Sequence, residues 1–163
     1  MSYVLKVILG IAVAGVASAQ GLVMQHNLTL GMAKTIAEAA LAECKSKGFS
    51  TAVAVVDRAG QVMVILRDEE ATAQQAEMAR RKAYTARMFR TTTLEFQKRT
   101  SEPFYAAQRD IADILALGGG APIQVGNGAG AVTIGGVGSS GSSQTQDDAC
   151  AKAGIAKVAA LLK

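Results

Sequence analysis

Apolar positions recur at helical spacing from Leu30 to Lys47. They lie three or four residues apart, at Ala33, Ile36, Ala37, Ala40, Leu41 and Cys44. Thr29, just before this segment, is a good N-cap, and Gly48, just after it, is a typical helix end. The pattern predicts an amphipathic helix that packs one face against the rest of the protein.

Two continuous apolar runs follow, Thr51–Val56 and Gln61–Leu66. Both runs are rich in β-branched residues, and the turn-forming stretch Asp57–Gly60 joins them. This arrangement predicts a β-hairpin. Because the runs are continuous rather than alternating, we expect at least one strand to be covered on both faces.

The segment Thr72–Arg90 has alanines at helical spacing, which predicts a helix with a small-residue face for close packing. Its other faces carry a basic stripe: Arg80, Arg81, Lys82, Arg87 and Arg90. We expect Thr93 to cap a short helix that ends near Arg99. Pro103 is expected to open a further helix that runs to about Ala116.

The glycine-rich sequence from Gly118 to Gly141 raises the question of a nucleotide-binding loop. Such a loop should follow a strand and open a helix. Here the glycines of 126–130 are followed by a second β-branched run, Ala131–Ile134, so we predict a hairpin whose first strand is Ile123–Val125. The Gly- and Ser-rich piece 135–143 then leads to a last helix, Gln144–Leu162.

The predicted order of helices and hairpins indicates a mixed α/β (α+β) fold, with helices packed against a small antiparallel sheet. The chain has 163 residues, of which half are hydrophobic and only 4% aromatic, so Ala, Val, Ile and Leu must build the core. The formal charge of +4 is modest and no long Lys/Arg run occurs, which argues against a nucleic-acid partner.

The first 19 residues have the form of a secretory signal peptide. One lysine precedes the apolar run Val7–Val16, and Ala17–Ala19 ends in a small-x-small cleavage pattern. We therefore expect a signal peptide over 1–19, a single domain over 20–163, and a periplasmic or secreted mature protein. An uncleaved N-terminal anchor is the alternative.

In an oxidising compartment Cys44 and Cys150 either form a disulfide or are two small buried residues.

Five short motifs, in order and spacing, resemble one family: Leu28–Leu30 before an Ala-rich helix, Ala54–Asp57 with Gly60, Lys82–Ala86, Gly119–Ile123, and Gly135–Gly141 with Asp147 soon after. The chain resembles the haem-binding and haem-degrading family, also called GlcG-like or HbpS-like, over about residues 28–160. The carboxy-terminal domain of some corrinoid adenosyltransferases belongs to the same family.

The resemblance implies a profilin-like fold, with a central antiparallel sheet and helices on its faces, and assembly into symmetric oligomers. It also implies haem as a cofactor or ligand, although many members have no secure biochemical role. The glycines at 135, 136 and 138 are expected to allow close approach of the backbone.

Three residues are candidates for ligand binding. His26 is the single histidine and a tentative axial ligand of haem iron, the alternative being a solvated residue in a mobile segment. Arg81 and Lys82 are candidates for binding a carboxylate, with a merely solvated helix face as the alternative. As surface residues, they should affect binding more than folding when replaced by Glu. Asp57 and Asp147 are fully explained as turn and cap residues, and no catalytic residues can be named.

The leading hypothesis is an exported, oligomeric protein that binds haem or another carboxylate-bearing small molecule. Two alternatives remain open: an enzyme acting on haem or a small organic acid, and a structural or sensory module that docks on a protein partner. No membrane contact is expected after cleavage of the signal peptide.

Overall fold

The computed structural model describes residues 21–163, so the predicted signal peptide lies outside the described residues. The helices are α1 (Leu30–Ser46), α2 (Ala73–Phe89), α3 (Thr93–Arg99) and α4 (Gln144–Lys157), with short 3-10 turns η1 (Pro103–Asp110), η2 (Gly128–Gly130) and η3 (Ala159–Leu161). The strands are β1 (Ala52–Val56), β2 (Val62–Arg67), β3 (Gly120–Val125) and β4 (Val132–Ser140).

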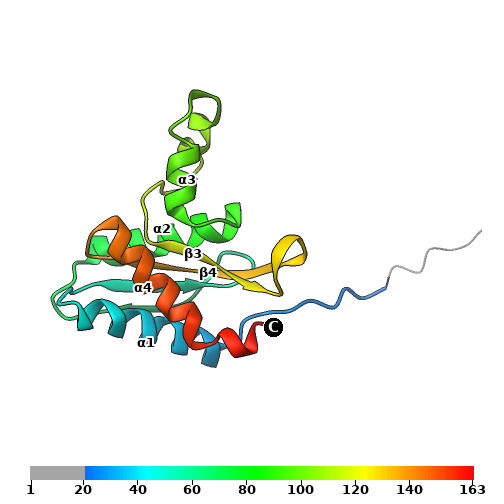
Figure 1. The fold of residues 1–163 in the computed structure, drawn as a ribbon, viewed down its shortest axis with the longest axis horizontal. Helices are drawn as coiled ribbons and strands as arrows, with labels where there is room; N and C mark the ends of the chain where they lie inside the picture. The colour runs from blue at the N-terminus through cyan, green and yellow to red at the C-terminus, as the bar shows by residue number, and fades with distance from the viewer. Residues whose placement is uncertain (1–20) are drawn as a thin grey trace, which may run out of the picture.

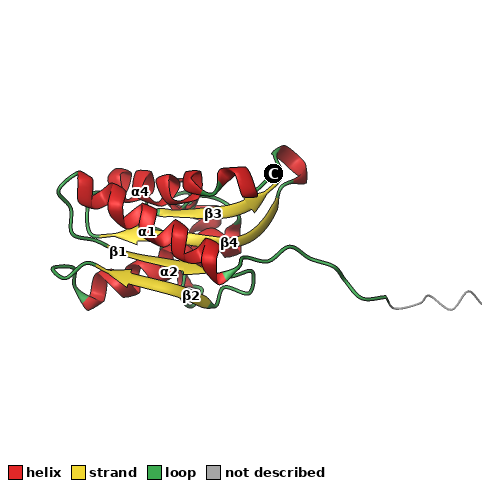
Figure 2. Cartoon of the chain, turned by 90° about the horizontal axis from the view of Figure 1, so that it is seen from below, coloured by secondary structure: helices red, strands yellow, loops and turns green. Residues whose placement is uncertain are grey.

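The strands form one antiparallel sheet in the order β2-β1-β4-β3. Helices α1 and α4 lie together on one face of the sheet, and α2 covers the other (Figures 1 and 2). Every residue of β1 is buried because that strand is central and covered on both sides. The predicted mixed α/β fold, with an antiparallel sheet between helices, is confirmed.

The sheet separates two hydrophobic cores of different composition. Branched side chains from the sheet pack with α1 and α4 in the larger core, where Ile36, Val53, Ile123 and Val137 are fully buried. The core under α2 consists mainly of alanines. Small side chains on both surfaces bring the backbone of α2 close to the sheet.

Strand β4 is longer than predicted, because the glycine-rich sequence expected to be a connection continues the strand to Ser140. A side chain at Gly136 or Gly138 would collide with the backbone of α2 at Ala83 and Ala79. Glycine in a strand interior usually marks such a close backbone approach. The hairpin prediction for the 126–130 turn is confirmed, since β3 and β4 pair across it.

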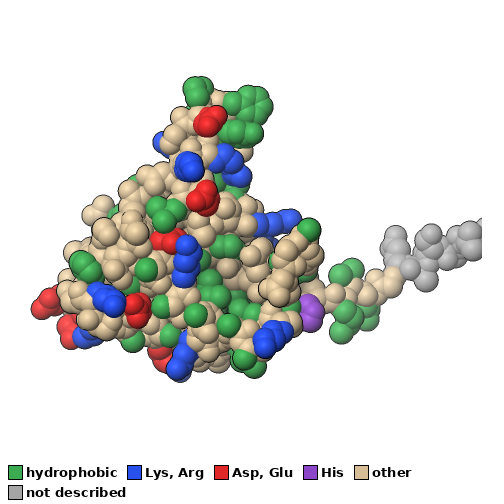
Figure 3. Space-filling view, in the orientation of Figure 1, with side chains coloured by type: hydrophobic (Ala, Val, Ile, Leu, Met, Phe, Trp, Pro, Cys, Tyr) green, Lys and Arg blue, Asp and Glu red, His purple; other side chains and the backbone are tan. Residues whose placement is uncertain are grey.

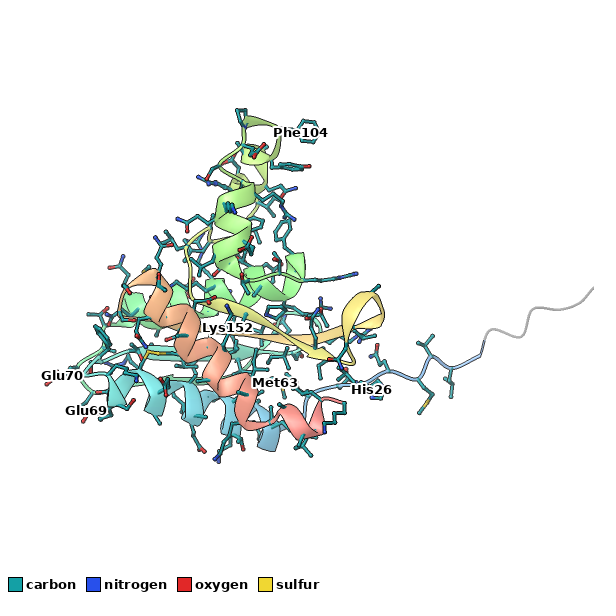
Figure 4. All side chains as sticks on the ribbon, viewed as in Figure 1. His26, Met63, Glu69, Glu70, Phe104 and Lys152 are labelled. Atoms are coloured by element: carbon teal, nitrogen blue, oxygen red, sulfur yellow. A yellow bond between two sulfur atoms is a disulfide. The ribbon has the colours of Figure 1, made fainter. Side chains whose placement is uncertain are left out.

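The segment from α3 through η1 to Ile114 projects from the body as an arm, with Ile114 at its base (Figure 1). The helix predicted from Pro103 to about Ala116 is wrong in length: only η1 forms, and none of its residues is buried, so no core stabilises a longer helix. Contacts within the arm hold its shape, since Arg109 Nε donates to Thr100 Oγ1 at 2.9 Å. Exposed apolar side chains, including Phe104, lie towards the end of the arm (Figures 3 and 4).

Cys44 and Cys150 form a disulfide with a Cα–Cα distance of 5.6 Å. Of the two alternatives for these cysteines, the disulfide is therefore the one found. The bond joins the last turn of α1 to the second turn of α4 across 106 residues of sequence, and both cysteines are fully buried.

Among the helices described, none is both long and apolar enough to cross a membrane.

Candidate functional site

Lys82 lies in the interior, in an ion pair with Asp147. Its Nζ is 2.8 Å from Asp147 Oδ2 and also donates to the carbonyl oxygen of Ser139 at 2.9 Å. Both side chains are only 2% exposed. Burial lowers the pKa of the Lys82 ammonium below its ordinary value, while the charge of Asp147 and its hydrogen bond act in the opposite direction. The pair joins α2 to the first turn of α4.

The expectation that Lys82 is a surface cation is therefore wrong, and so is the view that cap geometry fully explains Asp147. Asp147 also accepts from the backbone N–H and the hydroxyl of Ser142, so it ties three segments together. The burial of Lys82, although not its partner, could have been inferred from the sequence. Lys82 stands three residues after Ala79 and four before Ala86, on the buried face of its helix. As a ligand-contact residue Lys82 stays a prediction, but its ammonium faces the protein interior.

Arg81 is half-buried and points towards the base of the arm, where its Nη2 donates to the carbonyl oxygen of Ile114 at 2.6 Å. The neighbouring Arg80 binds Glu77 through two nitrogens and also pairs with Asp113 at 2.6 Å. Both residues connect α2 to the arm. No bound molecule tests Arg81 as a carboxylate ligand, so that role stays a prediction.

His26 lies on the segment that precedes α1, at the margin of the body (Figure 4). Its side chain is exposed, whereas Leu28 two residues later is buried and anchors the segment. His26 makes no side-chain hydrogen bond within residues 21–163. The three predicted site residues do not meet: Lys82 is in the interior, Arg81 is at the base of the arm, and His26 is on the N-terminal segment.

Three other arginines do converge. Arg58 comes from the turn between β1 and β2, Arg87 from the last turn of α2, and Arg90 from the residue that caps that helix. Together with Ala131, Val132 and Thr133 they line a cavity of about 150 Å³, which we call the arginine cavity. Within residues 21–163 none of these arginines makes an ion pair or a side-chain hydrogen bond.

No ion pair within the described part of the chain compensates the charges of this cluster. Burial lowers the pKa of Arg87, and the like charges of Arg58 and Arg90 lower it further, against a smaller opposing effect of Asp57. Two of the guanidinium nitrogens, Arg58 Nη1 and Arg87 Nε, are buried without a partner among the described residues. Such groups are costly to leave unpaired, which makes the cluster a candidate for binding an anion.

A second, wider cavity of about 530 Å³ shares Arg58 and Arg87 with the arginine cavity. Gln25 and Asn27 line it, together with Asp57 and Ala59, so it is bounded by the N-terminal segment that carries His26. We call it the N-terminal cavity. The sequence did not indicate this site, because Arg58 and Arg87 are brought together only by packing of the hairpin turn against the end of α2.

The chain is similar to known haem-related proteins over nearly its whole described length. The model of the family described as "haem degrading protein HbpS-like" matches residues 28–156. A double mutant of HbpS from Streptomyces reticuli is 33% identical, with 93% of this chain and 97% of that chain covered and a TM-score of 0.75.

Two further solved structures align with the chain. The ORFY protein of Klebsiella pneumoniae is 26% identical, with 86% and 96% of the two chains covered and a TM-score of 0.76. A structure of PduOC in complex with haem is 27% identical, with 80% and 94% covered and a TM-score of 0.68. No curated protein matches the sequence. The match of the family model over most of the chain shows that it belongs to the HbpS-like family of haem-degrading proteins.

Proposed function

We propose that this protein is an exported, oligomeric binding protein for haem or another carboxylate-bearing small molecule. One observation carries the proposal. Arg58 and Arg87, which have no partner within residues 21–163, line the N-terminal cavity together with Gln25 and Asn27, the neighbours of the single histidine. Membership of a family described as haem-degrading, and the haem complex of PduOC, support haem as the first ligand to test.

The residues present fit the chemistry of haem. The guanidinium fork binds a carboxylate through two parallel hydrogen bonds, so Arg58 and Arg87 match the propionate groups. A histidine nitrogen is a common axial ligand of haem iron, and the His26 side chain is exposed and engaged in no hydrogen bond of the described chain. When bound, haem would supply iron-centred redox chemistry. The chain's own residues would hold its carboxylates and its iron.

Titration with three porphyrins, followed by absorbance, tests the proposal. These are haem, metal-free protoporphyrin, and the dimethyl ester of protoporphyrin, which has no free carboxylates. We expect the Arg58→Gln and Arg87→Gln variants each to weaken binding of haem and of metal-free protoporphyrin. The loss of a charge-assisted contact, about 1.5–3 kcal/mol, corresponds to about ten- to a hundredfold in Kd. The ester should bind all of these proteins equally.

His26→Ala should change the Soret band of the haem complex and leave the Kd of metal-free protoporphyrin unchanged. Arg80→Gln is the matched control, since it removes an arginine of the same helix that already has carboxylate partners. Haem affinity unchanged in both the Arg58 and Arg87 variants would contradict the assignment of the cavity. Failure of the wild-type protein to bind any of the porphyrins would contradict haem as the ligand.

Export rests on the pattern of residues 1–19. Mass spectrometry of the protein from its native host should find a mature N-terminus at Gln20. A cytoplasmic protein that retains Met1 would overturn this part of the proposal.

Self-association is supported by the exposed apolar side chains of the arm, Phe104 and Ile111. Large exposed apolar side chains grouped on one projection are typical of an interface between proteins. Light scattering at micromolar concentration should therefore give a mass above that of one chain. A monomer mass that persists at higher concentration would contradict it.

A further inference from the structure

The eight arginines of the sequence fall into two groups. Five donate hydrogen bonds to oxygens of the protein: Arg67, Arg80, Arg81, Arg99 and Arg109. The other three, Arg58, Arg87 and Arg90, have no such acceptor within residues 21–163, and all three line the arginine cavity. The unpaired arginines are thus concentrated in one place, although they come from separate elements.

Within residues 21–163 no acidic side chain forms an ion pair with these three arginines. Asp57 is the acidic group that most affects Arg87, but it forms no ion pair with any of the three arginines. Its Oδ1 instead accepts from the backbone N–H groups of Ala59 and Gln61, which fixes the hairpin turn. Like charges held together without a counter-charge destabilise the folded state, and a bound anion would remove that cost.

The backbone at Arg90 is also held in an unfavourable conformation. Arg90 caps α2 with φ 56° and ψ 32°, in the left-handed region where glycine is the usual residue. Residues in that region cluster at ligand-binding sites, where the surrounding structure maintains the strain. Here the strained residue, Arg90, is one of those that line the arginine cavity.

The walls of the cavity define the class of ligand. A volume of about 150 Å³ is well below the 300–1,000 Å³ typical of sites for larger organic ligands, so only one small group fits. Guanidinium groups favour carboxylate and phosphate oxygens. Thr133 Oγ1, on the same wall, accepts from Gln124 Nε2 at 3.2 Å, which leaves its hydroxyl proton available for donation to an anion.

We infer that the arginine cavity is a binding site for a small oxyanion, a single carboxylate or phosphate group, which it binds without porphyrin or iron. The site shares Arg58 and Arg87 with the N-terminal cavity, and Arg90 and Thr133 belong to it alone. It therefore deepens the proposed function without depending on haem, and the two claims can fail separately.

The test uses the haem-free full-length protein with inorganic phosphate and with acetate, each compared with chloride at equal ionic strength. Calorimetry should show saturable binding, with a measurable Kd, for at least one oxyanion. The same ion should raise the melting temperature. Arg90→Gln and Thr133→Val should each raise that Kd. For Arg90→Gln the increase should be about tenfold or more. Arg80→Gln, the matched control, should bind as the wild type does.

A phosphate response without an acetate response would assign a phosphate group, and the converse would assign a carboxylate. Both are supporting results. The inference would be overturned if neither phosphate nor acetate stabilised the wild-type protein more than chloride does. An unchanged Kd in Arg90→Gln would also overturn it, and since Arg90 is exposed this variant should fold. Haem binding without oxyanion binding would refute this site alone, and the reverse would refute the proposed haem site alone.

Discussion

Helix α2 holds cations in two opposite situations. Lys82 is buried, but an aspartate and a backbone carbonyl satisfy its ammonium. Arg87, five residues later on the same helix, is half-buried beside two further arginines and has no acceptor in the described chain. The difference teaches that burial of a charge does not by itself mark a functional residue. The decisive feature is whether the described chain supplies a counter-charge, as it does for Lys82, or does not, as for Arg87.

The largest expected effect comes from removing the counter-charge of Lys82. Asp147→Ala should leave the ammonium buried and unpaired and lower the free energy of unfolding by about 3–5 kcal/mol. Urea denaturation at neutral pH measures this loss in the free energy of unfolding. The double variant Lys82→Met with Asp147→Leu should recover most of the loss, because it removes both charges. A loss below about 1 kcal/mol in Asp147→Ala, the size of an exposed ion pair, would contradict the structural role given to this pair.

The disulfide reinforces the same end of the molecule, since Cys44 Sγ lies 3.6 Å from Ser139 Oγ and Lys82 donates to the Ser139 carbonyl. Replacing both cysteines by alanine should lower the free energy of unfolding by about 2–4 kcal/mol, mainly because the unfolded chain gains freedom. Melting curves of the variant and of the reduced wild type should agree. Two free thiols in the unfolded, unreduced wild-type protein would refute the bond.

At the arginine cavity, removal of a charge should stabilise the protein rather than destabilise it. Arg90→Gly removes one of three like charges and places the preferred residue at a left-handed helix cap. We expect the free energy of unfolding to rise by about 0.5–1 kcal/mol, while the oxyanion response is lost. Chemical denaturation without added anion measures the first effect, and calorimetry the second. A destabilised Arg90→Gly protein would mean that the Arg90 side chain supports the fold.

The smallest effect is expected at Asp68, which pairs with Lys45 at the opposite end of α1 from His26. Hydrogen bonds from Ser50 and Lys45 lower the pKa of Asp68 from 3.8 to about 2. The folded state therefore binds its proton less readily than the unfolded state, so the stabilisation is complete above about pH 4 and is lost as the pH falls through about 2. Urea midpoints between pH 2 and pH 7 should decline less at the acid end for Asp68→Asn than for the wild type.

Features encoded by neighbouring residues could be predicted from the sequence. Helices α1 and α2 and the hairpin of β1 and β2 follow from apolar spacing and turn residues. The length of β4 could not be predicted this way, because its glycines favour a loop locally and form a strand only under the close backbone of α2. Helix formation after Pro103 was overpredicted, because residues of the arm have no core to pack on.

The charges were the hardest part to predict. Lys82 and Asp147 are 65 residues apart, and nothing near either residue reveals the partner. Arg58 and Arg90 approach each other only because the hairpin turn packs against the end of α2. From the sequence alone the basic stripe looks uniform, although the fold divides it into an internal pair, links to the arm and an unpaired cluster.

The bond between Cys44 and Cys150 turns the chain between them into a covalent ring that contains the whole sheet and the arm. A protease that cuts the exposed arm once, for example near Phe104, opens the ring without releasing a fragment. The mass of the intact protein would then rise by only one water molecule, and separate pieces would appear only after reduction. If the protein is exported, as we propose, this closure would keep the two parts of a chain cut once in the arm covalently joined.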